Sequence, residues 1–431
     1  MRGIARRQVL LVLRSIRVGS IRIQEQGGVT ECGESFEGAS LQATIVVHDR
    51  RFWQRVVLGG AVGAGDSYVA GMWDCHDLPV LIRILLRNRE VLKAIDGPLS
   101  AFQKFALSAL AGARKNSLGG ARHNVRKHYD LGNGFFELFL DETMTYSSAL
   151  FPEGTLDLRL AQETKNRRLC EYLKLSSRDH LLEIGSGWGE MAVYAAKNYG
   201  CTVTTTTIAE RQFERARERV AREGLQGRVT VLLSDYRDLT GQYDKLVSVE
   251  MLEAVGPEHL AGYFATCADL LRSDGLAAFQ MTTMLDGPFR RSRRAPDFIA
   301  ARVFPGSHIP SFASLYEAIS RGGGFRLYDY QELSSHYAVT LREWRKRFWT
   351  RQQRIRALGF PDGFLRTWDY YLGYCQGAFE ERYINCGQLV LARDQYRGQN
   401  LWGASTLATA FVQGPSRLAS APRPSESRGQ S

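Results

Sequence analysis

A glycine-rich loop is the part of the sequence whose residue types and spacing most directly suggest chemistry. It follows the strand-like run His180–Ile184, and its alternate positions are Gly185, Gly187 and Gly189. Glycine tolerates positive φ and has no side chain, so such a loop lets the backbone approach a ligand closely. A dinucleotide-binding loop needs glycine or alanine at position 190, where this chain has Glu190. The loop therefore argues against NAD.

An acidic residue before the loop favours a nucleotide-derived ligand other than NAD. Glu183 precedes the glycines, and the pattern G-x-G-x-G after an acidic residue is typical of methyltransferases with a nucleotide-binding sheet. There the loop lies against the aminocarboxypropyl end of the cofactor. A purely structural turn is the alternative, because tight turns also use glycine.

Two further strand ends bear on the nucleotide. A carboxylate for the ribose hydroxyls is expected about 20 residues after the loop, yet the first one after the next strand is Glu210. After the third strand, Asp235 and Tyr236 are suited to bind the adenine amino group and to stack on its ring. A capped turn is the alternative for this pair.

The elements that position these residues alternate between strand-like and helical runs. Strands are predicted at 180–184, 201–208, 229–233, 245–249, 276–281 and 388–391, and helices at 210–223, 259–271, 336–358 and 361–383. This alternation indicates an α/β fold with a parallel, doubly wound sheet, whose ligands bind at the carboxyl ends of the strands. Before it, short strands at 20–24 and 41–47 and a helix at 78–86 indicate a small α+β unit. We place the domains at 1–115, 116–400 and a disordered tail at 401–431.

Composition limits the class of protein. The 431 residues are 44% hydrophobic and carry a formal charge of +11, which suits phosphate-bearing partners, either nucleic acid or an anionic membrane. Seven scattered cysteines without a C-x-x-C pair argue against a disulfide framework, and no metal site is expected. We find no signal peptide and no apolar run of about 20 residues. The expected location is cytoplasmic and, at most, peripheral to the membrane.

Four ordered motifs resemble the cyclopropane-fatty-acid synthase and mycolic-acid methyltransferase family. They are NVRKHYDLGN at 124–133, LDETMTYS at 140–147, EIGSGWG at 183–189 and SVEMLEAVG at 248–256. The segment GDSYVAGMW at 65–73 looks like the extra amino-terminal domain of the phospholipid-acting branch. The resemblance covers most of the chain, from about position 65 to 393. It implies a Rossmann-like class I methyltransferase sheet with a helical lid, and an amino-terminal domain that docks on lipid.

The resemblance also implies the cofactor, S-adenosylmethionine, and a set of residues that bind it. The matching positions are Tyr146, Ser147, Gly185, Gly187, Gly189, Thr207, Gln212, Tyr236 and Arg237, to which the residue-based reasoning adds Glu183 and Asp235. Thr207 and Gln212 would take the place of the missing ribose carboxylate.

The implied reaction adds a one-carbon unit to the cis double bond of an unsaturated phospholipid acyl chain and gives a cyclopropane. It needs a dry slot, aromatic faces for a carbocation and one base. In the family a bicarbonate ion is that base, and Glu253 matches the carboxylate that holds it. The companions differ, because Ser148, Gln280 and Arg345 stand where relatives have cysteine, histidine and tyrosine.

Aromatic and cysteine positions complete the implied catalytic set. Tyr129 is expected at the pocket, and Cys375 matches a cysteine suspected of catalysis, with inert packing as its alternative. Aromatic residues near the slot are expected from Trp368, Tyr370, Tyr371, Tyr374 and Phe379.

Other functions and products remain open from the sequence. The altered anion pocket and Gln280 also suit relatives that make methyl- or methylene-branched chains, which would require a flavin-type reductase for a saturated branch. We expect a homodimer and no nucleic-acid partner. A nucleic-acid methyltransferase is disfavoured, because the Asp/Asn-Pro-Pro-aromatic loop is replaced by residues 250–257, EMLEAVGP. A lipid-binding protein without activity is a third possibility. The basic run Arg290, Arg291, Arg293 and Arg294 is either a lipid headgroup contact or a solvated surface.

Overall fold

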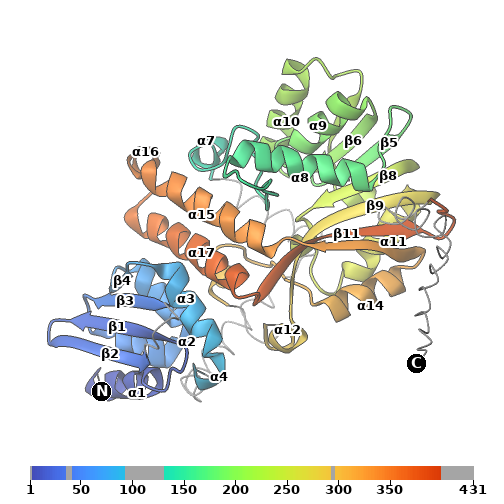
Figure 1. Ribbon diagram of the computed structural model, residues 1–431. Coiled ribbons are helices and arrows are strands. Elements are labelled where there is room, and N and C mark those ends of the chain that lie inside the picture. Colours follow the sequence, from blue (N-terminus) through green and yellow to red (C-terminus); the bar gives the residue numbers. More distant parts are fainter. Residues whose placement is uncertain (1, 35–40, 93–130, 293–296, 399–431) are drawn as a thin grey trace, which may run out of the picture.

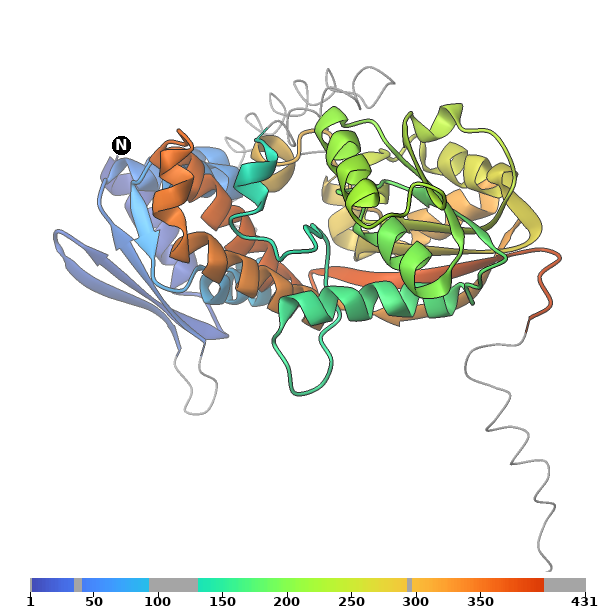
Figure 2. The same ribbon diagram turned by 90° about the horizontal axis from the view of Figure 1, so that it is seen from above.

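The computed structural model describes residues 2–34, 41–92, 131–292 and 297–398 (Figure 1). Helices in the middle of the molecule separate a small amino-terminal sheet from a larger sheet (Figures 1 and 2). The predicted boundary at 115/116, the tail at 401–431 and the basic residues at 293 and 294 lie outside the described residues.

The amino-terminal unit is a four-stranded sheet of order β2-β1-β3-β4 with helices packed against it. Its elements are α1 (Arg2–Leu13), β1 (Gly19–Glu25), β2 (Gly28–Glu34), β3 (Gln42–Val47), α2 (Arg51–Val69), β4 (Trp73–Cys75), α3 (Leu78–Arg87) and α4 (Arg89–Leu92). Alternate residues such as Ile21, Ile23 and Ile45 are buried, because successive side chains of a strand point to opposite faces. The predicted α+β architecture is confirmed, although α1, α2, β2 and β4 were not predicted.

The larger sheet has seven strands in the order β10-β11-β9-β8-β5-β6-β7. The strands are β5 (His180–Ile184), β6 (Thr202–Thr207), β7 (Val229–Leu233), β8 (Tyr243–Val249), β9 (Leu271–Met284), β10 (Phe325–Glu332) and β11 (Ile384–Arg393). Neighbours from β9 to β7 are parallel, whereas β11 is antiparallel to both β9 and β10. The predicted α/β fold is thus confirmed. The strand β10 was not predicted, because it is an edge strand whose residues are largely accessible.

Helices cover both faces of this sheet. The described helices that follow the amino-terminal unit are α7 (Asn133–Phe136), α8 (Leu158–Tyr172), α9 (Glu190–Tyr199), α10 (Glu210–Arg222), α11 (Leu260–Leu270), α12 (Asp286–Ser292), α13 (Phe298–Arg302), α14 (Phe312–Gly322), α15 (Ser334–Thr350), α16 (Gln352–Ala357) and α17 (Asp362–Glu380). Leu181 and Val247 pack in one core with α8 and α9, whereas the adjacent residues Leu182 and Leu246 pack in another with α11 and α14. Both faces are therefore buried, which explains the nearly continuous apolar runs of these strands.

Helices α15 and α17 join the two units. Helix α17 packs on α2 and α3 of the amino-terminal unit and on α15. The buried Asp369 of α17 accepts hydrogen bonds from the Tyr68 hydroxyl at 2.5 Å, from Arg345 Nε at 2.6 Å and from Trp349 Nε1 at 2.6 Å. The single predicted helix 336–358 is in fact α15 and α16, which are separated at Arg351.

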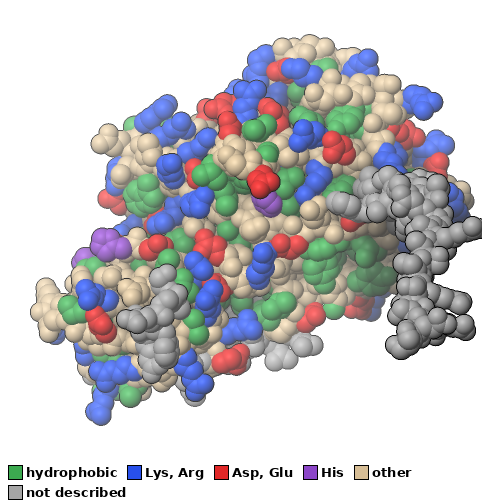
Figure 3. Space-filling model, in the orientation of Figure 1, with side chains coloured by type: hydrophobic (Ala, Val, Ile, Leu, Met, Phe, Trp, Pro, Cys, Tyr) green, Lys and Arg blue, Asp and Glu red, His purple; other side chains and the backbone are tan. Residues whose placement is uncertain are grey.

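The surface carries mixed charges. Figure 3 shows basic and acidic side chains interspersed over the face drawn, with no broad stripe of one sign. Among the described residues, no helix combines the length and the apolar character needed to cross a bilayer.

Candidate active site

Backbone hydrogen bonds hold the glycine loop at the carboxyl end of β5. The backbone N–H groups of Gly185 and Ser186 both donate to the Thr206 carbonyl of β6, with N···O distances of 3.0 and 2.8 Å. The φ angles of Gly185 and Gly187 are +98° and +48°, in the region that L side chains disfavour. The loop thus presents backbone at the sheet edge where doubly wound folds bind their ligands.

A cavity with about 1290 Å³ of atom-free space lies over this loop. It brings together ten of the eleven predicted cofactor residues: Tyr146, Ser147, Glu183, Gly185, Gly187, Thr207, Gln212, Asp235, Tyr236 and Arg237. Gly189 is not in the wall. It caps α9, and a Cβ there would lie 3.0 Å from Ala216 Cα of α10, so its role is to let the two helices pack closely.

One end of the cavity has hydroxyl, amide and carboxylate groups suited to a nucleoside. The Thr207 hydroxyl donates to Gln212 Oε1 at 2.9 Å, although the ribose carboxylate of other nucleotide folds is absent. The buried Asp235 accepts two hydrogen bonds from the Arg237 guanidinium, at 2.8 and 2.7 Å. The ring of Tyr236 lies edge-on to Tyr263, with centroids 5.0 Å apart, and is thereby fixed in the cavity wall.

The other end contains buried charges that the sequence reasoning found only in part. Burial raises the pKa of the predicted Glu183 to about 8, and its Oε2 has no hydrogen-bond partner among the described residues. Lys165 and Asn166 of α8 also line this end and were missed. Both lie on the buried stripe of α8 with Ala161 and Leu169. Three polar residues, Gln162, Lys165 and Asn166, on the buried face of this helix were the signal that could have identified them.

The anion pocket is filled by a carboxylate of the chain itself. Glu250 Oε1 accepts hydrogen bonds from the backbone N–H of Ser148 and from Gln280 Nε2, both at 2.8 Å. Its Oε2 accepts one from the Tyr337 hydroxyl at 2.7 Å. Burial raises the pKa of Glu250, against the effect of these bonds. Ser148 and Gln280 were predicted to surround an anion, and they bind Glu250, which lines the cavity and was missed as a catalytic candidate.

The remaining predicted catalytic residues lie elsewhere. Glu253 is buried behind the cavity wall, where Oε1 accepts from the Thr282 backbone N–H and Oε2 has no partner among the described residues. Burial raises the pKa of Glu253 to about 7, and the nearby Glu250 adds to this. Cys375 of α17 is not in the wall, and burial raises the pKa of its thiol well above the usual range.

Two further expectations have different outcomes. Tyr129 lies outside the described residues. Arg345 was expected to stand in place of a pocket tyrosine, but Tyr337, about two helical turns before it on α15, is the residue that contacts Glu250. Arg345 instead pairs with Asp369 at the junction with the amino-terminal unit.

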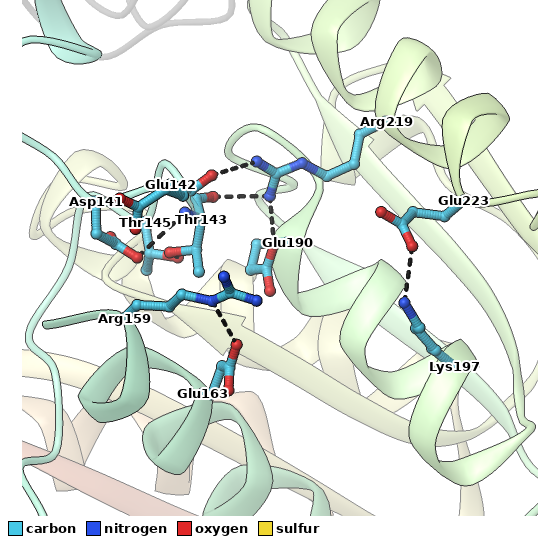
Figure 4. A network of polar contacts seen from close by, with 10 residues as sticks. All are labelled: Asp141, Glu142, Thr143, Thr145, Arg159, Glu163, Glu190, Lys197, Arg219 and Glu223. Atoms are coloured by element: carbon cyan, nitrogen blue, oxygen red, sulfur yellow. Dashed lines mark hydrogen bonds and ion pairs between the residues drawn. The ribbon is translucent and has the colours of Figure 1, made fainter. Parts of the chain in front are cut away.

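An arginine of α10 fixes the loop that closes the cavity. Figure 4 shows Arg219 reaching across to residues 142–143, where its guanidinium donates to the carbonyls of Thr143 at 2.7 Å and Glu142 at 3.3 Å. The same group pairs with Glu190, at the start of α9. Burial raises the pKa of Glu190 to about 7, against the effect of Arg219. Glu190, whose position argued against a dinucleotide-binding loop, thus pairs with the arginine that holds the segment carrying Tyr146 and Ser147.

Aromatic rings pack around Tyr146, which lines the cavity. The hydroxyls of Tyr146 and Tyr371 are 3.0 Å apart. The ring of Tyr146 also lies 5.2 Å from that of Trp344, and Tyr371 contacts Trp368 with ring centroids 5.7 Å apart. Of the predicted slot aromatics, Tyr371 thus reaches the cavity residues, whereas Tyr370 packs against Tyr68 of the amino-terminal unit.

The sequence matches a family model described as mycolic acid cyclopropane synthetase over residues 117–389. It is 36% identical over 348 residues to tuberculostearic acid methyltransferase UfaA1 of Mycobacterium tuberculosis, covering 79% of this chain and 81% of that protein. It is 35% identical to the cyclopropane-fatty-acyl-phospholipid synthase of Escherichia coli, covering 83% of this chain and 90% of that protein.

Solved structures show the same likeness. Mycolic acid cyclopropane synthase CmaA1, complexed with S-adenosylhomocysteine (SAH) and CTAB, superposes with a TM-score of 0.60 at 30% identity. The match covers 63% of this chain and 98% of CmaA1. The cyclopropane synthase MmaA2 from Mycobacterium tuberculosis gives a TM-score of 0.59 at 29% identity and the same coverage.

Proposed function

This chain belongs to the mycolic acid cyclopropane synthetase family of S-adenosylmethionine-dependent methyltransferases, and from this premise we propose that it adds a one-carbon unit to the cis double bond of an unsaturated phospholipid acyl chain. The observation that carries the proposal is Glu250, a buried carboxylate in the wall of the cofactor cavity, which accepts hydrogen bonds from the Ser148 backbone, Gln280, Tyr337 and, at 3.8 Å, the Cys386 thiol. The aromatic rings of Tyr146 and Tyr236 line the same cavity. An alkene that attacks a sulfonium methyl needs such a base and such rings, and it needs no nucleophilic side chain.

The cavity fits S-adenosylmethionine. The loop from Gly185 to Gly187 offers backbone, and the unpaired Oε2 of Glu183 offers an acceptor to the ammonium of the cofactor. Thr207 and Gln212 face the ribose, and Asp235 with Tyr236 faces the adenine. When bound, the cofactor supplies an electrophilic methyl group on a positively charged sulfur.

The residues of the chain would then control the cation that forms on the acyl chain. The ring of Tyr146 in the cavity wall, together with that of Tyr371, whose hydroxyl it contacts, would attract the positive charge. Glu250 accepts the proton that the cation loses, while Tyr337 and Gln280 keep its carboxylate oriented. Arg219 acts at a distance, as a positioning residue for the segment that carries Tyr146.

Bicarbonate does not fit this pocket as the predicted base. Glu253 was expected to hold the ion, with Ser148 and Gln280 among its altered companions, yet the Ser148 N–H, Gln280 and Tyr337 donate to Glu250. An additional anion would place a second negative charge beside a buried carboxylate, which is costly. We therefore assign proton removal to Glu250 and none of it to an exchangeable ion.

The internal carboxylate also favours a second candidate product. If the methyl group loses its proton at once, the ring closes to a cyclopropane. If a hydride first shifts along the chain, loss of the proton gives a methylene branch, and a flavin-type reductase would be needed to saturate it. The similarity to UfaA1, named a tuberculostearic acid methyltransferase, supports this second product.

The cellular setting belongs to the same proposal. We propose that residues 1–115 dock the enzyme on the inner face of the membrane, from the cytoplasm, and that residues 116–400 carry the catalytic site. We also propose a homodimer.

Expression in a bacterium that contains monounsaturated phospholipids tests the proposal. Fatty esters should gain about fourteen mass units, and fragmentation distinguishes a ring from a branch. Purified protein with labelled S-adenosylmethionine should label unsaturated vesicles and neither saturated vesicles nor nucleic acid. Label that enters only nucleic acid would refute the proposal, and cofactor binding without any turnover would indicate an inactive lipid-binding protein.

A further inference from the structure

Lys165 is a buried cation with hydrogen-bond donors that have no acceptor among the described residues. Lys165 lines the cofactor cavity, and its Nζ donates one hydrogen bond, to the Ser147 hydroxyl at 3.0 Å. Its residue is 1% exposed, and among the described residues no carboxylate lies within 4.0 Å of Nζ. An ammonium has three donors, and a buried charge without an ionic partner is costly. The remaining donors therefore point to an anion that enters the cavity.

The next residue along α8 supplies a second unpaired group. Asn166 is also 1% exposed and lines the same cavity. Neither its Oδ1 nor its Nδ2 has a hydrogen-bond partner among the described residues. A buried amide nearly always has partners in a folded protein, so this side chain also lacks a ligand.

An acceptor on β5 completes the arrangement. Glu183 Oε2 is buried and unpaired, and the carboxylate lies more than 4.0 Å from Lys165 Nζ, since no ion pair joins them. Lys165 is nevertheless close enough to lower the pKa of Glu183 against the larger effect of burial. Two opposite charges that face one cavity without touching leave room for a ligand that carries both signs.

We propose that Lys165 and Asn166 bind the carboxylate of the aminocarboxypropyl group of S-adenosylmethionine, with Lys165 Nζ and Asn166 Nδ2 as the donors. Glu183 accepts from the ammonium of the same group, so the cofactor tail bridges α8 and β5. Ser147, bonded to Lys165, links this contact to the segment that closes the cavity. The inference rests on the cofactor and not on the lipid substrate, so it is tested without lipid.

A pair of ligands that differ only in the carboxylate tests the inference by calorimetry. S-Adenosylmethionine and its decarboxylated form share the sulfonium, the nucleoside and the amine. Lys165→Met should weaken the binding of S-adenosylmethionine about 10- to 100-fold, as expected for a lost charge-assisted hydrogen bond. It should weaken the binding of the decarboxylated form by less than about 2-fold. Lys165→Arg keeps the charge and should recover part of the loss.

Two more variants keep the test independent of folding. Lys197→Met removes an exposed lysine of α9 that pairs with Glu223 outside the cavity, and it should change neither affinity. Asn166→Asp keeps the shape of the side chain but faces the ligand carboxylate with a negative charge. This substitution should reduce the affinity for S-adenosylmethionine at least about 10-fold more than the affinity for the decarboxylated form.

The ratio of the two affinities decides the outcome. If Lys165→Met and Asn166→Asp weaken both ligands equally, the two residues act only on the shape of the cavity and the inference is wrong. Unchanged affinity of Lys165→Met for S-adenosylmethionine would also overturn it. Loss of lipid methylation with the affinity ratio preserved would leave this inference standing and count against the proposed function alone.

Discussion

Replacement of Glu250 by Gln removes the proposed base while keeping its size. Glu250 Oε1 accepts hydrogen bonds from the Ser148 N–H, Gln280 Nε2 and, at 3.8 Å, Cys386 Sγ, and Oε2 accepts one from Tyr337, so at least one of these donors would face the new amide N–H₂. A buried donor without a partner costs about 1–3 kcal/mol. Loss of a buried charge offsets part of this cost, because burial already raises the pKa of the carboxyl. We expect a folded protein with a small shift in its melting temperature.

The effect on turnover should be much larger than the effect on stability. A positioned general base contributes about 10²- to 10⁴-fold to a rate, which corresponds to about 3–5 kcal/mol of barrier. SAH affinity should change by less than about 3-fold, since the other cofactor contacts remain. Wild-type activity should fall as pH decreases through the raised pKa of Glu250, because only the carboxylate accepts a proton. Residual activity of Glu250→Gln should lack this acidic limb.

The assay is transfer of labelled methyl to unsaturated vesicles at saturating cofactor, with Glu253→Gln as the matched control. Glu253 lies behind the wall, so its variant should retain more activity than Glu250→Gln. Glu250→Gly suits the φ of +50° at this position and frees the donors of Ser148, Gln280 and Tyr337. Bicarbonate should then restore activity to Glu250→Gly but not to Glu250→Gln. Wild-type rates in Glu250→Gln, or a reversed order of the two Gln variants, would refute the assignment.

Three further predictions follow from packing and burial. Asp369→Ala should lower the free energy of unfolding, measured by urea titration, by about 3–5 kcal/mol, because it leaves Arg345 without its partner. As a control, Asp362→Ala, which breaks an exposed ion pair, should lower it by under about 1 kcal/mol. Gly189→Ala should lower the melting temperature and the affinity for SAH more than Gly187→Ala does. Both positions have positive φ, but only at position 189 would the new Cβ lie 3.0 Å from Ala216. Equal effects of the two substitutions would contradict this reasoning. Cys375→Ser should keep turnover within about 3-fold of wild type in the vesicle assay, because a buried thiol with a raised pKa is a poor nucleophile; a loss above about 100-fold would restore it as a catalytic candidate.

The central strands of the large sheet were predictable because both of their faces are buried. The run at 180–184 matches β5 at both ends, since a parallel strand covered by helices is apolar along its length. The run at 229–233 also matches β7 at both ends, although β7 is an edge strand and only partly buried. The strand β10 and the helix α1 were not predictable in the same way. Their residues are mixed in character, and they are stabilised by contacts with β11 and α2 that lie far away in the sequence.

The nucleotide side of the site was predictable because it is built from consecutive residues at strand ends. Thr207 ends a strand, and Gly185 and Asp235 lie just after one, so the order of the strands alone brings them together. Lys165 and Glu250 required tertiary information. Lys165 lies on α8, before the first strand of the large sheet. Glu250 accepts hydrogen bonds from residues of several other segments of the chain.

The choice between Glu250 and Glu253 shows what spacing alone leaves undetermined. Both carboxylates follow β8 and are three residues apart, yet only Glu250 lines the cavity. Its φ of +50° turns the chain so that the carboxylate meets Ser148, Gln280 and Tyr337. A non-glycine residue in this conformation costs about 1–2 kcal/mol, and such strain persists where the surroundings determine it, commonly at functional sites. A base fixed in this way has one orientation toward the cavity. The position of the acyl chain relative to Glu250 would then decide which proton is lost, and with it whether a ring or a branch is formed.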